Sequence, residues 1–270
     1  MKKILIVTDL DGTLLNPRDY SFKSALPALQ RVRELKIPLI FCSSKTRAEI
    51  EVYREKLQNN HPFISENGGG VFIPDNYFPF LLDVPRHGKY RVISLGKPYH
   101  EIRAQFMTLR EKTEVNLKGF GDMTTREIVE LTGLSTTEAE LARQRDFGEP
   151  FIFEDKQDEV FLQSIEQAGL HWTHGRLFHI MGNHDKGQAF EILMSFYQQE
   201  GEIFQTIGLG DSLNDLPFLQ AVDHPVLIRQ ENGHHDARIK IPGIFRTRYS
   251  CSTGWNEAVT FLLKKMLLEN

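Results

Sequence analysis

The chain has 270 residues, 40% of them hydrophobic, which is enough for an ordinary globular core and argues against a disordered protein. Its 32 Lys and Arg against 36 Asp and Glu give a formal net charge of −4 without a long basic block, so nucleic acid is a poor candidate partner. Cys42 and Cys251 are too few for a disulfide framework and lack metal-ligand spacing, which fits a reducing cytoplasm.

The chain begins with an apolar run, Ile4 to Val7, followed by Asp9 and Asp11. Four apolar residues are too few for a signal-peptide core or a membrane span, so we expect a cytoplasmic protein without a membrane partner. An unpaired carboxylate inside a buried strand would cost far more than the strand gains by burying apolar surface. The two aspartates are therefore expected where the strand reaches the surface, and Gly12 permits a sharp turn there.

The two ends of the chain alternate between strand and helix patterns. Apolar β-branched runs are typical of parallel strands covered on both faces, and the stretches between them place apolar residues at helical spacing. This alternation predicts an α/β fold with a doubly wound parallel sheet. The expected strands are 3–7, 37–42, 62–65, 204–210 and 225–228, and the expected helices are 22–36, 46–57, 185–199, 216–221 and 254–268.

The middle of the chain has a different sequence pattern, in which short strand candidates such as RVISL and PFIFE alternate with polar helices. We expect residues 84–179 to form an inserted α+β cap on a core made of residues 1–83 and 180–270. The aromatic run YFPFLL at 77–82 precedes the cap, and hinge packing is favoured there over a membrane or partner patch.

Four polar motifs follow predicted strands or begin helices: DLDGT at 9–13, SSKT at 43–46, DKG at 185–187 and GDSLND at 210–215. Ligands of open parallel sheets bind at the carboxyl ends of the strands, so these motifs are expected to converge there. Two groups of carboxylates form a hard oxygen site suited to Mg²⁺. A serine hydroxyl, the N–H groups of the following helix and Lys186 complete an anion cradle, so the set predicts a phosphoryl site.

These four motifs, in this order, resemble those of the haloacid dehalogenase superfamily, and the inserted lobe resembles the cap of its sugar-phosphatase branch. LIFCSSKTRAE, FISENGG, THGRLFHI and GDSLNDLPFL further resemble the mannosyl-3-phosphoglycerate phosphatase family over nearly the whole chain. The resemblance implies a Rossmann-like core and a Mg²⁺-dependent phosphatase that acts on a small phosphorylated sugar derivative.

The resemblance also implies roles for individual residues. Asp9 would be the nucleophile that forms an aspartyl-phosphate, and Asp11 the acid and then the base. Mg²⁺ would be held by Asp9, the backbone carbonyl of Asp11 and Asp211, with Asp215 as a direct or water-mediated ligand. The phosphate would be held by Ser43, Ser44 and Lys186. Further candidates are Asn67, on the turn that could reach substrate, and Asn214, which could orient Lys186 or Asp215.

The segment HWTHGRLFH near the end of the cap has several interpretations. Its histidines His171, His174 and His179, with His184, suggest zinc, but no cysteines accompany them, and alternation with aromatic residues favours a hairpin. The turn Thr173, His174, Gly175 and Arg176 could instead deliver a guanidinium to the carboxylate of a glycerate group. Ser43 and Asp185 also have a simpler interpretation as helix caps.

The leading functional hypothesis is hydrolysis of mannosyl-3-phosphoglycerate, with glucosyl-3-phosphoglycerate or another sugar phosphate as the alternative substrate. A phosphosugar mutase of similar fold would keep the phosphoenzyme but return the phosphoryl group to another hydroxyl. A non-catalytic phosphate-binding protein would retain binding without turnover. Oligomeric state and the choice of sugar are not encoded in these patterns.

Overall fold

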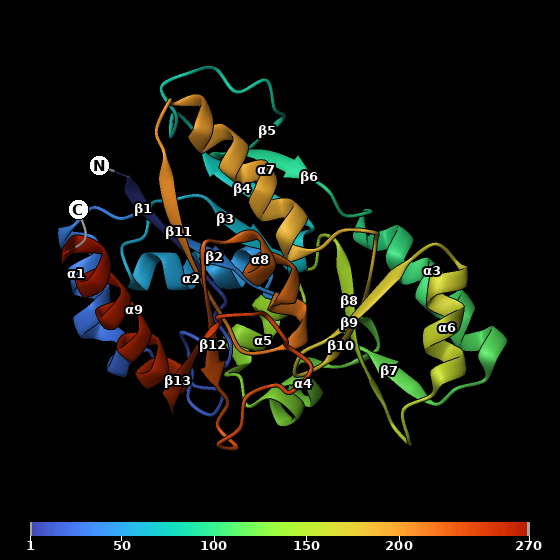
Figure 1. Cartoon of the computed structure of the whole chain (residues 1–270). Coiled ribbons are helices and arrows are strands. Elements are labelled where there is room, and N and C mark those ends of the chain that lie inside the picture. The colour runs from blue at the N-terminus through green and yellow to red at the C-terminus, as the bar shows by residue number, and fades with distance from the viewer. Residues whose placement is uncertain (1, 269–270) are drawn as a thin grey trace.

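The computed structural model describes residues 2–268, which form two lobes joined side by side (Figure 1). The larger lobe is built from both ends of the chain, and both termini lie on its side away from the second lobe. Its strands are β1 (Lys3–Thr8), β2 (Leu39–Cys42), β3 (Phe63–Ser65), β4 (Gly70–Pro74), β5 (Arg86–His87), β6 (Tyr90–Ser94), β11 (Phe204–Gly210), β12 (His224–Arg229) and β13 (Phe245–Ser250). Its helices are α1 (Leu26–Glu34), α2 (Arg47–Lys56), α7 (Lys186–Gln199), α8 (Leu216–Ala221) and α9 (Cys251–Leu268).

The core sheet confirms the predicted doubly wound α/β architecture. Within residues 2–268 its strands follow the order β13-β12-β11-β1-β2-β3-β4-β6-β5. The pairs from β13 to β3 are parallel, and β4, β6 and β5 extend the sheet as an antiparallel edge. The carboxyl ends of β1, β2 and β11 therefore lie next to one another, which places the polar motifs that follow them at one edge.

Both faces of this sheet are covered, as the continuous apolar runs predict. In β1, Ile4 and Ile6 pack into one hydrophobic cluster with residues of α1, α2 and α9. Leu5 and Val7 pack into the opposite cluster with residues of α7 and α8. The two-residue alternation of a strand thus divides one apolar run between two cores.

The second lobe is the inserted cap. Within the described residues its antiparallel sheet has the order β7-β8-β10-β9, formed by β7 (Leu117–Gly119), β8 (Gly148–Phe153), β9 (His171–His174) and β10 (Phe178–Met181). Its helices are α3 (Tyr99–Thr113), α4 (Thr125–Thr132), α5 (Thr136–Ala142) and α6 (Glu159–Gln167). Residues of α3 and α6 share one apolar cluster with the sheet, while residues of α4 and α5 form a smaller one.

The expected start of the cap at residue 84 needs correction, because β5 and β6 belong to the core sheet. The RVISL segment is a strand as predicted, but Val71 of β4 pairs with Ile93 of β6. Hydrogen bonding to the β4 edge therefore keeps the chain in the core until after Ser94. At the other end, β10 carries the cap sheet through Met181, one residue beyond the expected start of the second core segment.

The histidine-rich segment forms the expected hairpin of β9 and β10, with Phe178 opposite His174. Among residues 2–268, histidines take part in no group of His, Cys, Asp and Glu side chains close enough to share a metal, so nothing supports zinc there. Phe78 of the YFPFLL run packs into a core cluster, which supports internal packing, but the run precedes β5 and β6 of the core sheet and so does not lie at the hinge to the cap. Strand β13 was not predicted. No helix in the described part of the chain is long and apolar enough to cross a membrane.

Candidate active site

Three aspartates from distant parts of the sequence meet at the carboxyl end of the core sheet. Asp9 follows β1 and Asp211 follows β11, and these neighbouring strands pair in register up to Thr8 and Leu209. Asp215 lies one turn after Asp211. One carboxylate oxygen from each of the three lies within 4.8 Å of the others, and all three residues are buried.

Lys186, the first residue of α7, provides a positive charge beside this cluster. Its Nζ lies 2.6 Å from Oδ1 of Asp9 and 2.6 Å from Oδ1 of Asp215, and its side chain is inaccessible to solvent. Asp185 caps the helix by accepting a hydrogen bond from the N–H of Gln188 at 2.8 Å, as the simpler interpretation of that residue predicted. The burial of Lys186 at a helix N-terminus is offset by its two carboxylate partners.

The loop after β11 is held by the carboxylate of Asp215. Its Oδ2 accepts hydrogen bonds from the N–H groups of Asp211, at 2.9 Å, and Ser212, at 3.1 Å. Across the site, Gly12 has a φ of +81°, and a Cβ there would lie 2.9 Å from Oδ2 of Asp211. The turn after β1 therefore requires glycine both for its conformation and for its close approach to Asp211.

The charges in this cluster do not balance. Burial raises the pKa of Asp9 to about 7, Lys186 opposes that shift, and the neighbouring Asp215 reinforces it. Burial, and then the charges of Asp215 and Asp9, raise the pKa of Asp211 well above its usual range. Three buried carboxylates thus share one ammonium group, which is the electrostatic situation that a bound cation relieves.

The donor set fits a hard divalent cation. All three groups offer carboxylate oxygen, the ligand type that Mg²⁺ prefers, and the residues hold those oxygens close together. Two polar side chains steady Asp211: Thr13 donates to its Oδ1 at 3.1 Å, and Gln230 Nε2 lies 3.3 Å from its Oδ2. Such partners orient a ligand without displacing a metal.

Asp11 faces away from this group toward Lys45. Its Oδ2 lies 3.1 Å from Lys45 Nζ, which is also 3.2 Å from Oε1 of Glu49. The other oxygen of Asp11 is buried and has no hydrogen-bond partner among the described residues. The side chain of Asp11 is therefore held at one oxygen and has acceptor capacity left at the other.

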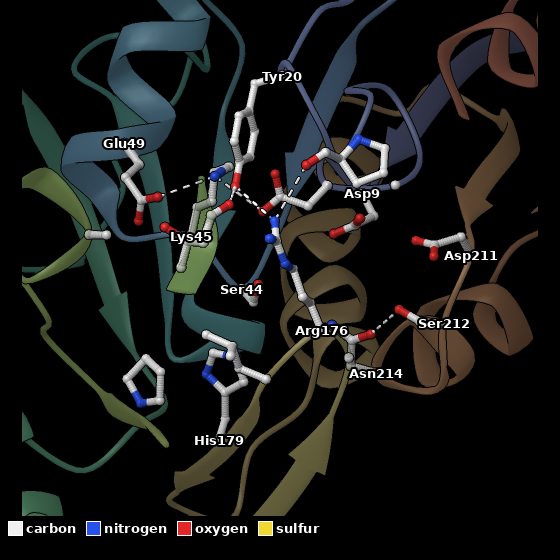
Figure 2. A pocket seen from close by; sticks show the side chains of 18 of the residues that line it. Asp9, Tyr20, Ser44, Lys45, Glu49, Arg176, His179, Asp211, Ser212 and Asn214 are labelled. Atoms are coloured by element: carbon white, nitrogen blue, oxygen red, sulfur yellow. Dashed lines mark hydrogen bonds and ion pairs between the residues drawn. The ribbon is translucent and has the colours of Figure 1, made fainter. Parts of the chain in front are cut away.

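The carboxylates open into a pocket of about 400 Å³ between the two lobes, a size typical of small-ligand sites (Figure 2). Its core wall includes Asp9, Asp11 and Asp211, and its cap wall includes Arg145, Arg176 and His179. The pocket also contains the predicted residues Ser44, Gly175 and Asn214. Lys186 and Asp215 are buried and are not among the residues that line it.

The SSKT loop supplies backbone and hydroxyl groups to the site. Ser43 is fully buried, and its Oγ accepts a hydrogen bond from the N–H of Lys45 at 3.2 Å. The N-cap of α2 is Thr46, not Ser43, and it forms a capping box with Glu49. Ser43 therefore does not cap the helix and keeps its hydroxyl proton, but it is not among the residues that line the pocket, whereas Ser44 is.

The predicted cap residues divide between the pocket and the hairpin. Arg176 Nη1 donates to the hydroxyl of Tyr20 at 3.0 Å and to the carbonyl of Pro17 at 3.4 Å. Thr173 and His174 belong to β9, and the ring of His174 stacks on Phe178 with centroids 4.0 Å apart. Neither of these two lies among the residues lining the pocket.

Asn67 and Asn214 contact each other, with Nδ2 of Asn214 donating to Oδ1 of Asn67 at 3.1 Å. Asn214 also accepts a hydrogen bond from Ser212 Oγ at 2.7 Å. The hydrogen bonds of Asn214 in the described chain thus run to Asn67 and Ser212, where we expected one to Lys186 or Asp215. The pair joins the turn after β3 to the loop after β11.

Several pocket residues were not predicted from the sequence. Lys45 stands within a motif that drew attention only for its serines, and its burial could not be read from that motif. Tyr20, Arg145 and Gln230 lie in segments without a recognisable pattern, and His179 was considered only as a possible zinc ligand. A lysine directly after two candidate phosphate-binding serines was the one available signal.

Residues 6–239 match the family described as haloacid dehalogenase-like hydrolase. The chain belongs to this family. A relative from Persephonella marina, named glucosyl-3-phosphoglycerate/mannosyl-3-phosphoglycerate phosphatase, is 44% identical over 97% of this chain and 98% of its own. A mannosyl-3-phosphoglycerate phosphatase from Pyrococcus furiosus is 38% identical over 87% of this chain and 96% of its own.

Solved structures share the family fold at low sequence identity. A Thermoplasma acidophilum protein aligns with a TM-score of 0.71 at 16% identity, over 97% of this chain and 99% of its own. The sucrose-phosphatase of a Synechocystis species aligns with a TM-score of 0.60 at 13% identity, over 97% of this chain and 98% of its own. At these identities the likeness concerns the core and cap architecture alone.

Proposed function

We propose that this protein is a phosphatase that hydrolyses glycosyl-3-phosphoglycerates, with mannosyl-3-phosphoglycerate as the preferred substrate and glucosyl-3-phosphoglycerate as the second. The observation that carries the proposal is the buried group of Asp9, Asp211 and Asp215 around Lys186, which opens into a pocket below the cap. Relatives that align over nearly their whole length and bear these substrate names support it.

Asp9 is the nucleophile in this proposal. Lys186 holds one of its oxygens at 2.6 Å, which orients the carboxylate and opposes the rise in its pKa that burial causes. Attack on phosphorus forms an aspartyl-phosphate and breaks the bond from phosphorus to the substrate oxygen. Water then hydrolyses the aspartyl-phosphate, releasing inorganic phosphate and regenerating Asp9.

Asp11 acts as the acid and base. Protonated, it gives a proton to the leaving glycerate oxygen, and the resulting carboxylate then takes a proton from the attacking water. Lys45 fixes its Oδ2 and leaves Oδ1 to exchange that proton. The cap forms one wall of the pocket, and its closure over a bound substrate would exclude bulk water and strengthen these polar interactions.

Mg²⁺ would be held by Asp9 and Asp211, with Asp215 directly or through water and the carbonyl of Asp11 as a further ligand. When bound, it would neutralise negative charge between the carboxylates and the phosphate. Ser43, Ser44 and Lys186 would hold the oxygens of the transferring group, since phosphoryl transfer depends mainly on alignment and charge neutralisation.

The experiment that tests this function measures phosphate release with Mg²⁺ from a panel of mannosyl- and glucosyl-3-phosphoglycerate, sucrose phosphate and hexose phosphates. We expect the two glycosyl-3-phosphoglycerates to be hydrolysed fastest, and Asp9→Asn to abolish release. Conversion of substrate without phosphate release would favour a mutase. Binding without turnover in the wild-type protein would favour a non-catalytic role. Equal, weak turnover across the panel would contradict the substrate assignment.

Arg176 is proposed to bind the glycerate carboxylate. A guanidinium has five N–H donors, and the hydrogen bonds that Arg176 makes within residues 2–268 use only Nη1. Arg176→Ala is expected to lower kcat/KM for glycosyl-3-phosphoglycerates about tenfold more than for hexose phosphates, in steady-state assays of phosphate release. Equal losses on both substrate classes would contradict this contact.

A further inference from the structure

Tyr20 connects the core to two separate parts of the cap. It lies on the loop between β1 and α1, and its hydroxyl donates to the carbonyl of Thr132 at 3.0 Å. The same hydroxyl accepts a hydrogen bond from Arg176 Nη1 at 3.0 Å. Thr132 ends α4, where helix carbonyls lack partners within the helix, and Arg176 lies on the turn between β9 and β10. One hydroxyl thus joins the core to both.

The ring of Tyr20 contacts Lys45, which in turn pairs with the carboxylate of Asp11. Lys45 Nζ lies 4.9 Å from the centroid of that ring, within the range of a cation–π contact. The same ammonium group lies 3.1 Å from Oδ2 of Asp11. Figure 2 shows Tyr20, Lys45 and Arg176, which all line the pocket, pointing toward one another.

The position of Lys45 depends on its surroundings because its charge is buried. Only 5% of its side chain is exposed, and its neighbours are Asp11, Glu49 and the rings of Tyr20 and Tyr53. Displacing the Tyr20 ring would remove one wall around the ammonium group and let water compete for it. The carboxylate of Asp11 would then lose its fixed partner.

We propose that Tyr20 is a positioning residue that couples docking of the cap to the orientation of Asp11 through Lys45. The proposal rests on the proposed function, because it assigns Asp11 the proton transfer to the leaving oxygen. The hydroxyl of Tyr20 contacts the cap and its ring contacts Lys45. The effect on cap docking and the effect on Asp11 can therefore be tested separately.

Two variants of Tyr20, one control variant and three substrates distinguish the effect of the hydroxyl from that of the ring. Tyr20→Phe removes the hydroxyl and keeps the ring, Tyr20→Leu removes both, and Tyr249→Phe, at an exposed tyrosine, is the matched control. Mannosyl-3-phosphoglycerate engages the cap, glycerol 3-phosphate is small with an alkoxide leaving group, and p-nitrophenyl phosphate is small with a leaving group that needs little protonation.

For Tyr20→Phe we expect kcat/KM for mannosyl-3-phosphoglycerate to fall about tenfold, mainly through KM, with both small substrates changed less than about twofold. For Tyr20→Leu we expect an additional loss of about tenfold in kcat for both alkyl phosphates and a smaller loss for p-nitrophenyl phosphate. Equal losses on all three substrates, or none with Tyr20→Phe, would overturn the proposal.

A measurement that does not need turnover distinguishes this proposal from the proposed function. Amide hydrogen exchange over residues 128–134 is expected to quicken in Tyr20→Phe and to stay unchanged in Tyr249→Phe, because only the first loses the bond to Thr132. Unchanged exchange in Tyr20→Phe would overturn the docking role. Absence of phosphate release from every substrate by the wild-type protein would instead overturn the proposed function.

Discussion

The close grouping of three buried carboxylates, those of Asp9, Asp211 and Asp215, lowers the stability of the folded protein but provides the oxygen atoms that the site needs. One ammonium group, Lys186, contacts two of them, while Asp211 is neighboured by the other carboxylates and has only neutral side-chain partners. The raised pKa of Asp211 expresses this cost, because a buried anion near like charges prefers to be neutral. Strain of this kind is common at functional sites.

Asp211→Asn is therefore expected to stabilise the metal-free protein. Asparagine keeps an acceptor for the hydroxyl of Thr13 and removes one buried charge, so in EDTA its Tm should rise by about 2–5 °C. Added Mg²⁺ should raise the Tm of the wild-type protein but not that of the variant, and the variant should release no phosphate. A lower Tm of Asp211→Asn in EDTA, measured by calorimetry, would contradict the electrostatic argument.

At the scale of elements, the segment between β10 and α7 joins the cap to the core beside the turn that follows β3. This 3₁₀ turn, Glu66–Gly68, has positive φ at all three residues. A Cβ on Gly68 would lie 2.1 Å from the carbonyl oxygen of Asp185, so the joining segment packs directly onto the turn. His184 Nε2 lies 3.3 Å from the carbonyl of Glu66 and donates to it.

The burial of His184 predicts a loss of stability in acid. Burial lowers the pKa of His184 from 6.5 to about 4, so the folded state keeps the ring neutral while the unfolded state takes up a proton. The free energy of unfolding should be at its full value above pH 6.5. It should fall as the pH drops toward 4, by up to about 3 kcal/mol from this residue.

Urea unfolding at pH 8, 6 and 5 tests this contribution. His184→Gln, which retains an N–H donor, should lose less stability between pH 8 and pH 5 than the wild-type protein. His100→Gln, at an exposed position on α3, should lose as much as the wild-type protein. An identical pH dependence in His184→Gln and the wild-type protein would show that His184 is not held neutral by the fold.

At the scale of the whole molecule, Glu66 fastens the cap to the core. Its carboxylate accepts hydrogen bonds from the N–H groups of Asp146, Phe147 and Gly148, at 2.7, 3.0 and 3.0 Å. Arg145 Nη2 lies 3.0 Å from its Oε2, and Arg145 Nη1 donates to the carbonyl of Ser44 at 3.2 Å. The SSKT loop and the cap are therefore linked through one buried ion pair.

Glu66→Gln is expected to lower the free energy of unfolding by about 2–4 kcal/mol and to uncouple the lobes. Glutamine offers one acceptor oxygen in place of two and leaves Arg145 without its buried anion. The sequence has two tryptophans, Trp172 in the cap and Trp255 in the core, so fluorescence of variants retaining one of them follows each lobe.

The wild-type lobes should unfold at one urea concentration, whereas in Glu66→Gln the cap should unfold first. Glu34→Gln removes an exposed partner of Arg31 and should change stability by less than about 1 kcal/mol. Coincident transitions of the two tryptophans in Glu66→Gln would contradict a fastening role for Glu66.

Much of the fold could be predicted because strands and helices leave local periodic patterns. The runs at 204–210 and 216–221 coincide with β11 and α8. Strands β5 and β6 were assigned to the wrong lobe, since a short antiparallel strand looks the same whichever sheet it joins. Strand β13, FRTRYS, was missed because it is a largely exposed edge strand that contains no apolar run.

The sequence alone determined which chemistry is available: Asp9, Asp11 and Asp211 stand at strand ends because carboxylates cannot remain inside an apolar run. Only the tertiary structure decided the pairings, such as Lys186 between Asp9 and Asp215, and Lys45 between Asp11 and Tyr20. The physical reason is the difference in sequence separation between the interacting residues. Periodicity and turn chemistry act over a few neighbouring residues, whereas these contacts join segments that only sheet topology and cap docking bring together.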